Sequence, residues 1–330
     1  MRRFLFIYCF LMLTSFSARA QEITVGALTF PGDPFDQYMQ RFAMNLQAQA
    51  LPGVSLKLLI RGEVGPEEVL MRSVRRGRVE IASFTASGLS AVLPEFDLLR
   101  APYLFSSFEE VDYALDQYIA PLMVDLLAAQ DLQFLVFSDE GWFNLYGQSD
   151  FVSPKSTQGE RLRALQSPAS QSFIRSIGAD MIQIPFADVM TGLQTGLISG
   201  GETGTMIYAA ASLSEEAPYL TLTRHAYSAG AMVAYKPWYD SLSRTVRIAL
   251  VEAVPPVTFI RPLLRKWISD ELKGLGQRGV SIRDLTKDQR KQWSDATRTN
   301  LAALVANMDG KGDAMYAAII DAKKSFSQRD

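Results

Sequence analysis

The sequence contains one cysteine, Cys9, and one histidine, His225, among 330 residues. This scarcity argues against a zinc site built from cysteines or several histidines, and against mechanisms that need two histidines. The sequence also lacks a G-x-S-x-G elbow, a G-x-G-x-x-G fingerprint and a P-loop. These absences remove support for a serine hydrolase of that type and for a nucleotide cofactor. No metal and no cofactor is expected.

His225 lies in "TLTRHAYSAG", on or near a predicted strand. A Ser-His-Asp arrangement would have to use this residue. We interpret it instead as a structural histidine that is hydrogen-bonded to the backbone. Glu67 and Glu68 stand at a predicted helix start, where acidic residues suit the helix dipole, and we interpret them as solvated caps.

The first twenty residues have the features of a secretory signal peptide. Arg2 and Arg3 precede an apolar run, and "ARA" at 18–20 has the form of a cleavage site. The run is too short to span a membrane. We therefore predict a signal peptide at 1–20, export to the periplasm and a mature chain that begins near Gln21. Cys9 leaves with this segment, so no disulfide is expected.

The full sequence has 33 basic and 35 acidic residues, and the predicted signal peptide contains three arginines and no acidic residue. The mature chain therefore has 30 basic and 35 acidic residues, a net charge of about −5. An acidic chain of this kind lacks the basic face that nucleic acid requires. Nothing after the signal peptide resembles a membrane-spanning segment, so no direct membrane insertion is expected.

The order of predicted elements is typical of an α/β protein. Strands at 23–28, 54–60 and 79–84 alternate with helices that begin near Pro34 and Pro66. This βαβαβ order indicates an open sheet with helices on both faces. Later segments also alternate between predicted strands and helices. The remaining predicted strands are at 133–138, 162–165 and 181–185. The remaining predicted helices are at 168–177, 187–195, 245–272, 287–308 and 313–327. Without a Pro-rich or Ser-rich linker, we expect two lobes that several crossing strands join, with a cleft between them.

Four stretches in this order resemble the DctP-type substrate-binding proteins of TRAP (tripartite ATP-independent periplasmic) transporters. They are "GPEEVLMRSVRRGRVEIA", "LPEFDLLRAPYLFSSFEEVDYAL", "RLRALQSPASQSFIRSIGADMIQIPFADVMTGLQTGLISGGET" and "RHAYSAGAMVAYKPWYDSL". The resemblance implies a two-lobed periplasmic binding protein fold with a ligand cleft between the lobes and additional C-terminal helices. It places lobe I at 21–140 plus 229–268 and lobe II at 141–228 plus 269–330.

The resemblance also implies a ligand site. Arg163, in "RLRAL", stands where the family's arginine binds the ligand carboxylate in a two-pronged salt bridge, and a planar guanidinium suits that task. The helix that starts near Pro168 is expected to point N–H groups toward the same anion. Phe143 stands where sialic-acid binders have a second arginine, which favours a simpler monocarboxylate. The other residues expected to contact the ligand by resemblance are Thr203, Phe186, Thr85, Trp142 and Tyr208.

The resemblance implies a periplasmic receptor that binds a small organic acid and delivers it, as a monomer, to a DctQ/DctM-type permease driven by an ion gradient. Two alternatives stay open from the sequence. The first is an exported enzyme that acts on a small carboxylate. The second is a receptor that presents its ligand to a sensor.

Overall fold

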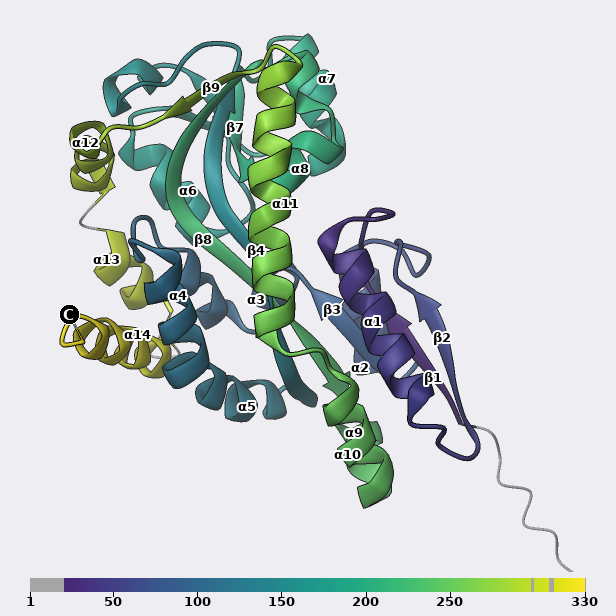
Figure 1. Ribbon diagram of the computed structural model, residues 1–330. Helices are drawn as coiled ribbons and strands as arrows, with labels where there is room; N and C mark the ends of the chain where they lie inside the picture. Colours follow the sequence, from purple (N-terminus) through teal and green to yellow (C-terminus); the bar gives the residue numbers. More distant parts are fainter. Residues whose placement is uncertain (1–20, 298–299, 309–311, 330) are drawn as a thin grey trace, which may run out of the picture.

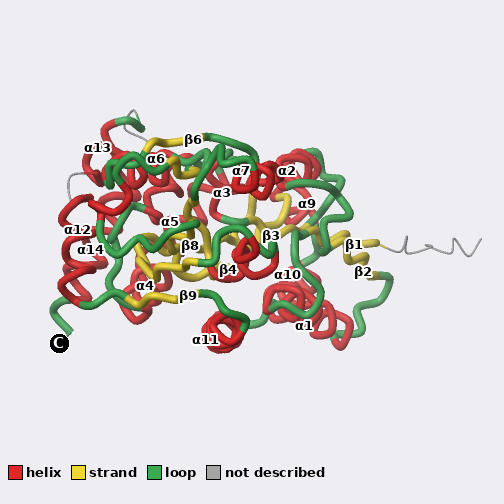
Figure 2. The backbone as a smooth tube through the Cα atoms, turned by 90° about the horizontal axis from the view of Figure 1, so that it is seen from above, coloured by secondary structure: helices red, strands yellow, loops and turns green. Residues whose placement is uncertain are grey.

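The computed structural model describes residues 21–297, 300–308 and 312–329. The predicted signal peptide, residues 1–20, lies outside the described residues. Strands run through the middle of the molecule and helices cover both sides of them (Figures 1 and 2). The α/β architecture predicted from the sequence is therefore confirmed.

The described strands form a single mixed sheet. Its order is β2-β1-β3-β8-β4-β7-β5-β6, and β9 pairs with the beginning of β8, whereas β3 pairs with the end of β8. β1, β2 and β3 run parallel to one another, as do β5, β6 and β7. The strands are β1 (Gln21–Gly26), β2 (Val54–Leu59), β3 (Ile81–Phe84), β4 (Leu132–Gly147), β5 (Arg161–Arg163), β6 (Asp180–Ile182), β7 (Gly200–Gly204), β8 (Tyr219–Tyr235) and β9 (Ser281–Asp284).

Two long antiparallel strands join the two halves of this sheet. β4 has 16 residues and β8 has 17, and they pair along most of their length. The first part of β4 lies in the half that contains β1, β2 and β3, and its last part pairs with β7 in the other half. The predicted strand at 133–138 is thus only the beginning of β4. The expectation that crossing strands connect the halves is confirmed.

The pairing of β4 with β8 is irregular where the strands pass from one half to the other. Asp139 lies opposite Ala229 and Gly141 lies opposite Ser228, so Glu140 is the extra residue of a β-bulge. Gly141 has a φ of 90°, a conformation that glycine adopts without strain. A bulge bends a strand and redirects a side chain. Here it points Glu140 away from the regular ladder.

Helices pack on both faces of the sheet (Figure 2). The α-helices are α1 (Pro34–Ala48), α2 (Glu67–Arg75), α3 (Ala86–Ser90), α4 (Phe108–Ala114), α5 (Ala120–Ala128), α6 (Pro168–Ser176), α7 (Val189–Gln194), α8 (Thr205–Ala210), α9 (Lys236–Ser241), α10 (Arg244–Ala253), α11 (Val257–Gln277), α12 (Lys287–Thr297), α13 (Asn300–Ala306) and α14 (Asp313–Phe326). Shorter helical turns are η1 (Pro94–Arg100), η2 (Leu115–Ile119), η3 (Pro154–Thr157), η4 (Phe186–Asp188) and η5 (Leu213–Glu215).

The long helix predicted at 245–272 is wrong in one respect. The segment forms two helices, α10 and α11, which are separated at Pro255-Pro256. Proline lacks the N–H that a helix interior needs, and it restricts the residue before it. The helix predicted at 187–195 is also divided, into the turn η4 and the helix α7.

Side chains of alternate residues in β8 pack into two separate hydrophobic cores. Met232 and Ala234 pack in a cluster with residues of α1 and α10, whereas Ala231 and Val233 pack in a cluster with residues of α2 and α14. This alternation follows the two-residue period of a strand. The apolar face of α1 is buried in the first of these clusters, through Tyr38, Phe42 and Leu46.

The C-terminal helix α14 packs against α4 and η2. These elements lie within 21–140, the larger segment of predicted lobe I, although the prediction assigned residues 313–326 to lobe II. α12 contacts α6 and β8 instead. The division of the chain into lobes stays a prediction, and α14 is the element whose packing departs from it. Within the described residues, no helix is both long and apolar enough to cross a membrane.

Candidate functional site

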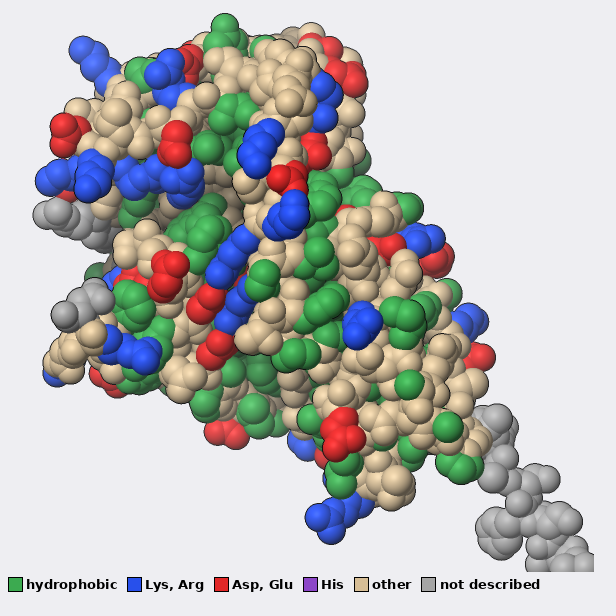
Figure 3. Space-filling model, viewed as in Figure 1, with side chains coloured by type: hydrophobic (Ala, Val, Ile, Leu, Met, Phe, Trp, Pro, Cys, Tyr) green, Lys and Arg blue, Asp and Glu red, His purple; other side chains and the backbone are tan. Residues whose placement is uncertain are grey.

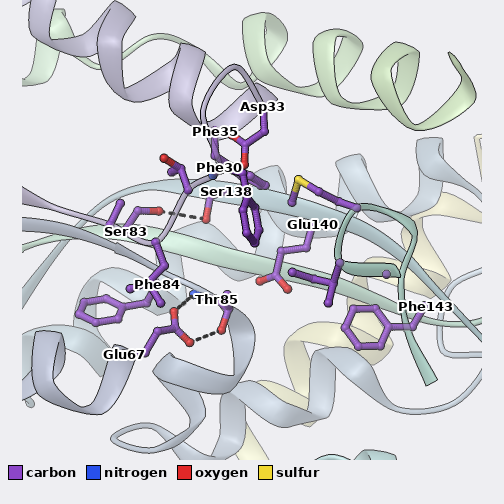
Figure 4. A pocket seen from close by; sticks show the side chains of 16 residues that line it. Phe30, Asp33, Phe35, Glu67, Ser83, Phe84, Thr85, Ser138, Glu140 and Phe143 are labelled. Carbon is purple, nitrogen blue, oxygen red and sulfur yellow. Dashed lines mark hydrogen bonds between the residues drawn. The ribbon is translucent and has the colours of Figure 1, made fainter. Parts of the chain in front are cut away.

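A cavity lies where the two halves of the sheet meet (Figure 4). Ala27–Phe30, with Asp33 and Phe35, line it after β1, and Ser83–Thr85 line it at the end of β3. Gly204 and Met206 approach from the other half. Together with its mouth, which is open to solvent, the space measures about 670 Å³. Carboxyl ends of parallel strands are the usual ligand position in an open α/β sheet.

Carboxyl groups line one part of this cavity. The bulge residue Glu140 accepts the backbone N–H of Ala86 at 2.8 Å and the hydroxyl of Ser228 at 2.9 Å. Burial raises the pKa of the Glu140 carboxyl to about 7. Glu67 reaches in from the first turn of α2, and burial raises the pKa of its carboxyl as well. The interpretation of Glu67 as a solvated cap is therefore wrong.

Thr85 is one of the predicted ligand contacts that line the cavity. It caps α3, where its Oγ1 accepts the N–H of Gly88 at 3.2 Å. The same hydroxyl donates to Glu67 at 2.5 Å, and the backbone N–H of Thr85 donates to Glu67 at 2.6 Å. Glu67 and Thr85 therefore form one hydrogen-bonded unit at the edge of the cavity (Figure 4).

Phe143 is the second predicted contact on the cavity wall. Its side chain is 6% exposed. The guanidinium carbon of Arg100 lies 4.9 Å from the centre of its ring, which is within the range of a cation–π contact. A positive charge therefore lies close to position 143, where sialic-acid binders have an arginine, but here Arg100 of η1 supplies it.

Arg163 ends β5, which occupies 161–163 rather than the predicted 162–165. Its Nε donates to the carbonyl of Ile184 at 3.3 Å, and its guanidinium carbon lies 5.7 Å from the ring centre of Phe186. Burial lowers the pKa of this guanidinium. Within the part of the chain that the structure describes, Arg163 makes no ion pair. Phe186 is 46% exposed, and the structure brings it together with Arg163.

Of the predicted contacts, Thr85 and Phe143 line the cavity, whereas Arg163, Phe186 and the remaining three do not. Thr203 is buried in β7, opposite Asn144 of β4. Trp142 packs with its ring centre 5.0 Å from that of Tyr227. Tyr208 is fully buried, and its hydroxyl donates to the carbonyl of Ala217 at 2.8 Å. The polar atom of Tyr208 is thus already engaged within the protein.

The N-terminus of α6 does not offer its N–H groups to a ligand, and that expectation is wrong. The backbone N–H of Ala169 donates to Asp97 at 2.8 Å, and the N–H of Ser170 donates to Ser167 at 3.2 Å. Asp97 also accepts the hydroxyl of Ser167 at 2.6 Å. The protein's own carboxylate therefore occupies the place expected for a bound anion.

His225 is a buried structural residue, although its partners are side chains. Its Nε2 lies 2.5 Å from Glu202 and its Nδ1 lies 2.8 Å from the hydroxyl of Thr223. Its ring stacks on Phe173 at 3.7 Å. Burial is the largest effect on the Glu202 carboxyl and would raise its pKa, but the contact with His225, the charge of Arg100 and the hydrogen bond with Ser170 together outweigh burial and lower this pKa. Among the described residues, no group of three or more His, Cys, Asp or Glu is arranged to hold a metal ion.

Sequence reasoning missed Arg100 and Glu140. Arg100 ends η1 and is 3% exposed. The available signal was an arginine next to apolar residues, in "DLLRAP", and an acid before a glycine, in "DEGW". Neither signal indicates which tertiary neighbours the residue meets.

Two α/β halves, continuous strands between them and a cavity at their junction define the class of two-lobed solute-binding receptors. A family model described as bacterial extracellular solute-binding protein, family 7 (DctP), matches residues 26–307. The chain belongs to this family. Proteins of this family are soluble periplasmic receptors, and the chain is a solute receptor of the TRAP type.

Similar proteins agree with this assignment. The chain is 26% identical over 294 residues to the 2,3-diketo-L-gulonate-binding periplasmic protein YiaO of Escherichia coli K12, covering 88% of this chain and 89% of that protein. The sugar acid binding protein DctPAm of Advenella mimigardefordensis, solved with galactonate, has a TM-score of 0.83 at 24% identity, covering 93% and 99%. A TRAP solute-binding protein of Ochrobactrum anthropi has a TM-score of 0.84 at 24% identity, covering 94% and 97%. The predicted two-lobed fold is confirmed.

Proposed function

We propose that the chain binds a small monocarboxylic acid that carries hydroxyl groups. The ligand carboxylate binds the guanidinium of Arg163, and the hydroxylated end lies in the cavity beside Glu140, Glu67 and Thr85. Phe186 and Phe143 pack against the ligand, and Thr203 contributes one hydroxyl. The observation that carries this proposal is Arg163, a largely buried guanidinium that has no ion pair among the described residues.

The chemistry of Arg163 supports a carboxylate ligand. Burying a guanidinium without a counter-charge is unfavourable, and burial already lowers its pKa. Its Nε is held by the carbonyl of Ile184, which fixes the side chain while the rest of the planar fork has no partner in the described residues. A carboxylate matches that fork and restores the charge balance.

The chemistry of the cavity supports hydroxyl groups at the other end of the ligand. Its polar lining residues include Glu67, Glu140, Ser83 and Ser138. Carboxyl and hydroxyl oxygens accept hydrogen bonds from a sugar hydroxyl, whereas the carboxylates of Glu67 and Glu140, when charged, would repel a second carboxylate. Relatives named for diketogulonate and solved with galactonate bind acids of this kind.

The finer features of the transport role are also part of the proposal. The segment 1–20 directs export to the periplasm, and the receptor works as a monomer. It delivers its ligand to a membrane permease of the DctQ/DctM type. It returns the ligand chemically unchanged, which distinguishes it from an enzyme that acts on the same acid.

The first test is native mass spectrometry of the purified mature chain, followed by calorimetry with D-galactonate, D-glucuronate and succinate. We expect binding of a hydroxylated monocarboxylate that is recovered unchanged. Arg163→Ala is expected to raise the Kd more than roughly a hundredfold, since two charge-assisted hydrogen bonds are lost. Thr203→Ala is expected to raise it only about tenfold or less.

Arg161→Ala is the matched control, because this exposed arginine lies two residues away on the same strand. It is expected to bind as the unmodified chain does. Normal binding by Arg163→Ala would overturn the site assignment. Turnover of the bound acid would overturn the receptor role in favour of an enzyme.

A further inference from the structure

Arg100 is a buried arginine without a hydrogen-bonded carboxylate. Its Nη1 donates to the hydroxyl of Ser87 at 3.1 Å, and its Nε is buried and has no hydrogen-bond partner among the described residues. The nearest carboxylate oxygen, Asp97 Oδ1, lies 3.9 Å from Nη1. That oxygen already accepts the hydroxyl of Ser167, and the other oxygen of Asp97 accepts the N–H of Ala169.

The same protein neutralises another buried arginine completely. Arg261 is 5% exposed, close to the 3% of Arg100. Its Nε lies 2.8 Å from Asp139, and its two terminal nitrogens lie 2.7 and 2.8 Å from Asp116. A buried guanidinium normally needs such partners, because desolvation of the charge is costly. Arg100 is equally buried but lacks such partners among the described residues, so its charge is balanced less completely than that of Arg261.

Arg100 lies next to the wall of the cavity. Its guanidinium lies against Phe143, which lines the cavity, although Arg100 and Arg163 do not line it themselves. The charge of Arg100 disfavours the charged form of Arg163 and favours the charged forms of the Glu140 and Glu202 carboxyls, and Glu202 in turn favours the charge of Arg163. Arg100 is thus close enough to Arg163 for their charges to interact, and the described residues place no carboxylate in ion-pair distance of Arg163. An anion between them would relieve both.

We propose that Arg100 is a second anion-binding residue of the cleft, and that the ligand carboxylate lies between the guanidinium groups of Arg100 and Arg163. This inference rests on the proposed function, because it assumes that an acid binds at Arg163. It adds a residue that supplies positive charge from η1, at the side of Phe143.

The arrangement also selects the charge of the ligand. The two guanidinium groups favour one carboxylate at their end of the cleft, whereas Glu140 and Glu67 disfavour a second carboxylate at the other end. The site therefore prefers a monocarboxylate to the dicarboxylate of the same carbon skeleton. D-galactonate and D-galactarate form such a pair.

The test measures binding of D-galactonate and D-galactarate by calorimetry, with Arg100→Gln and Arg100→Lys. The Gln variant is expected to raise the Kd for D-galactonate roughly ten- to a hundredfold, the loss of one or two hydrogen bonds to a charged group. The Lys variant keeps the charge but loses the planar fork, so an intermediate loss is expected. The unmodified chain is expected to bind D-galactonate at least about tenfold more tightly than D-galactarate.

The stability of the ligand-free variants distinguishes a binding role from a structural role. Arg100→Gln removes an incompletely paired buried charge, so its melting temperature is expected to stay the same or rise. Arg261→Gln breaks a complete buried network and is expected to melt at a lower temperature. If Arg100→Gln bound D-galactonate normally, or melted as low as Arg261→Gln, the inference would be overturned.

The pattern of results also separates this inference from the proposed function. Loss of binding in Arg163→Ala with normal binding in Arg100→Gln would overturn only the role of Arg100. Normal binding in Arg163→Ala, or no binding of any acid by the unmodified chain, would overturn both.

Discussion

Asp97 accepts the backbone N–H of Ala169 at 2.8 Å, across 72 positions of the sequence. The contact ties η1 to the first turn of α6, the helix that follows Arg163. It places a negative charge at the positive end of that helix. Since η1 also carries Arg100, the same short turn fixes both the helix that follows Arg163 and the second cation of the cleft.

Replacing Asp97 with Asn is expected to lower the free energy of unfolding by about 1–2 kcal/mol, because a charged helix cap is lost. Urea unfolding of the ligand-free protein measures this change. Ser243→Ala, which removes the exposed cap of α10, is the control and is expected to have a smaller effect. An Asp97→Asn variant as stable as the unmodified protein would contradict the role of this contact.

Glu140 is expected to make stability depend on pH. The pKa of its carboxyl is about 7 in the folded protein and 4.5 as the ordinary value. Between these values the folded state holds a proton that the unfolded state has released. The free energy of unfolding therefore falls as pH rises from 4.5 to 7, by at most about 3 kcal/mol.

Urea unfolding of the unmodified protein and of Glu140→Gln between pH 4.5 and pH 8 isolates this effect. Other titrating groups contribute equally to both proteins, so the difference in unfolding free energy reports Glu140. We expect the unmodified protein to lose stability relative to the variant as pH rises, with no further change above about pH 8. A difference that stays constant with pH would show that the Glu140 pKa is not raised.

The ion pairs of α11 differ in what they contribute. Arg261 is buried among Asp139, Asp116 and Asp112, whereas Lys266 pairs with Asp270 on the exposed side of the helix. Figure 3 shows acidic and basic side chains next to one another along this helix. Arg261→Gln is expected to destabilise the protein by about 3–5 kcal/mol, because it leaves the buried Asp139 uncompensated.

Lys266→Gln is expected to change the unfolding free energy by less than about 1 kcal/mol, since water screens an exposed pair. Thermal and urea unfolding of the two variants test this contrast. Equal effects would mean that the buried network contributes no more than a surface pair. They would also remove Arg261 as a reference for Arg100.

The elements that the sequence predicted well carry their own start and stop signals. α6 begins after Ser167 at Pro168, and its C-terminus lies just before Gly178, as expected from capping. The lengths of β4 and β8 could not be predicted in this way. In β4 the polar run Ser138–Glu140 interrupts the apolar pattern, although these residues stay in the strand and face partners from distant segments.

The site was predictable only in part, for the same physical reason. Arg163 ends a strand in a recognisable segment, so its proposed role as a ligand contact followed from local pattern and resemblance. The roles proposed for Arg100 and Glu140 depend on neighbours that are distant in the sequence. Whether a buried charge finds a full counter-charge is decided by tertiary packing, which a single sequence does not display.

β4 and β8 run unbroken through both halves of the sheet, and the described residues contain no separate linker about which the halves could rotate. A change in the angle between the halves would therefore bend these two strands. The bulges near Glu140 and Asn144 interrupt the ladder and concentrate that bending.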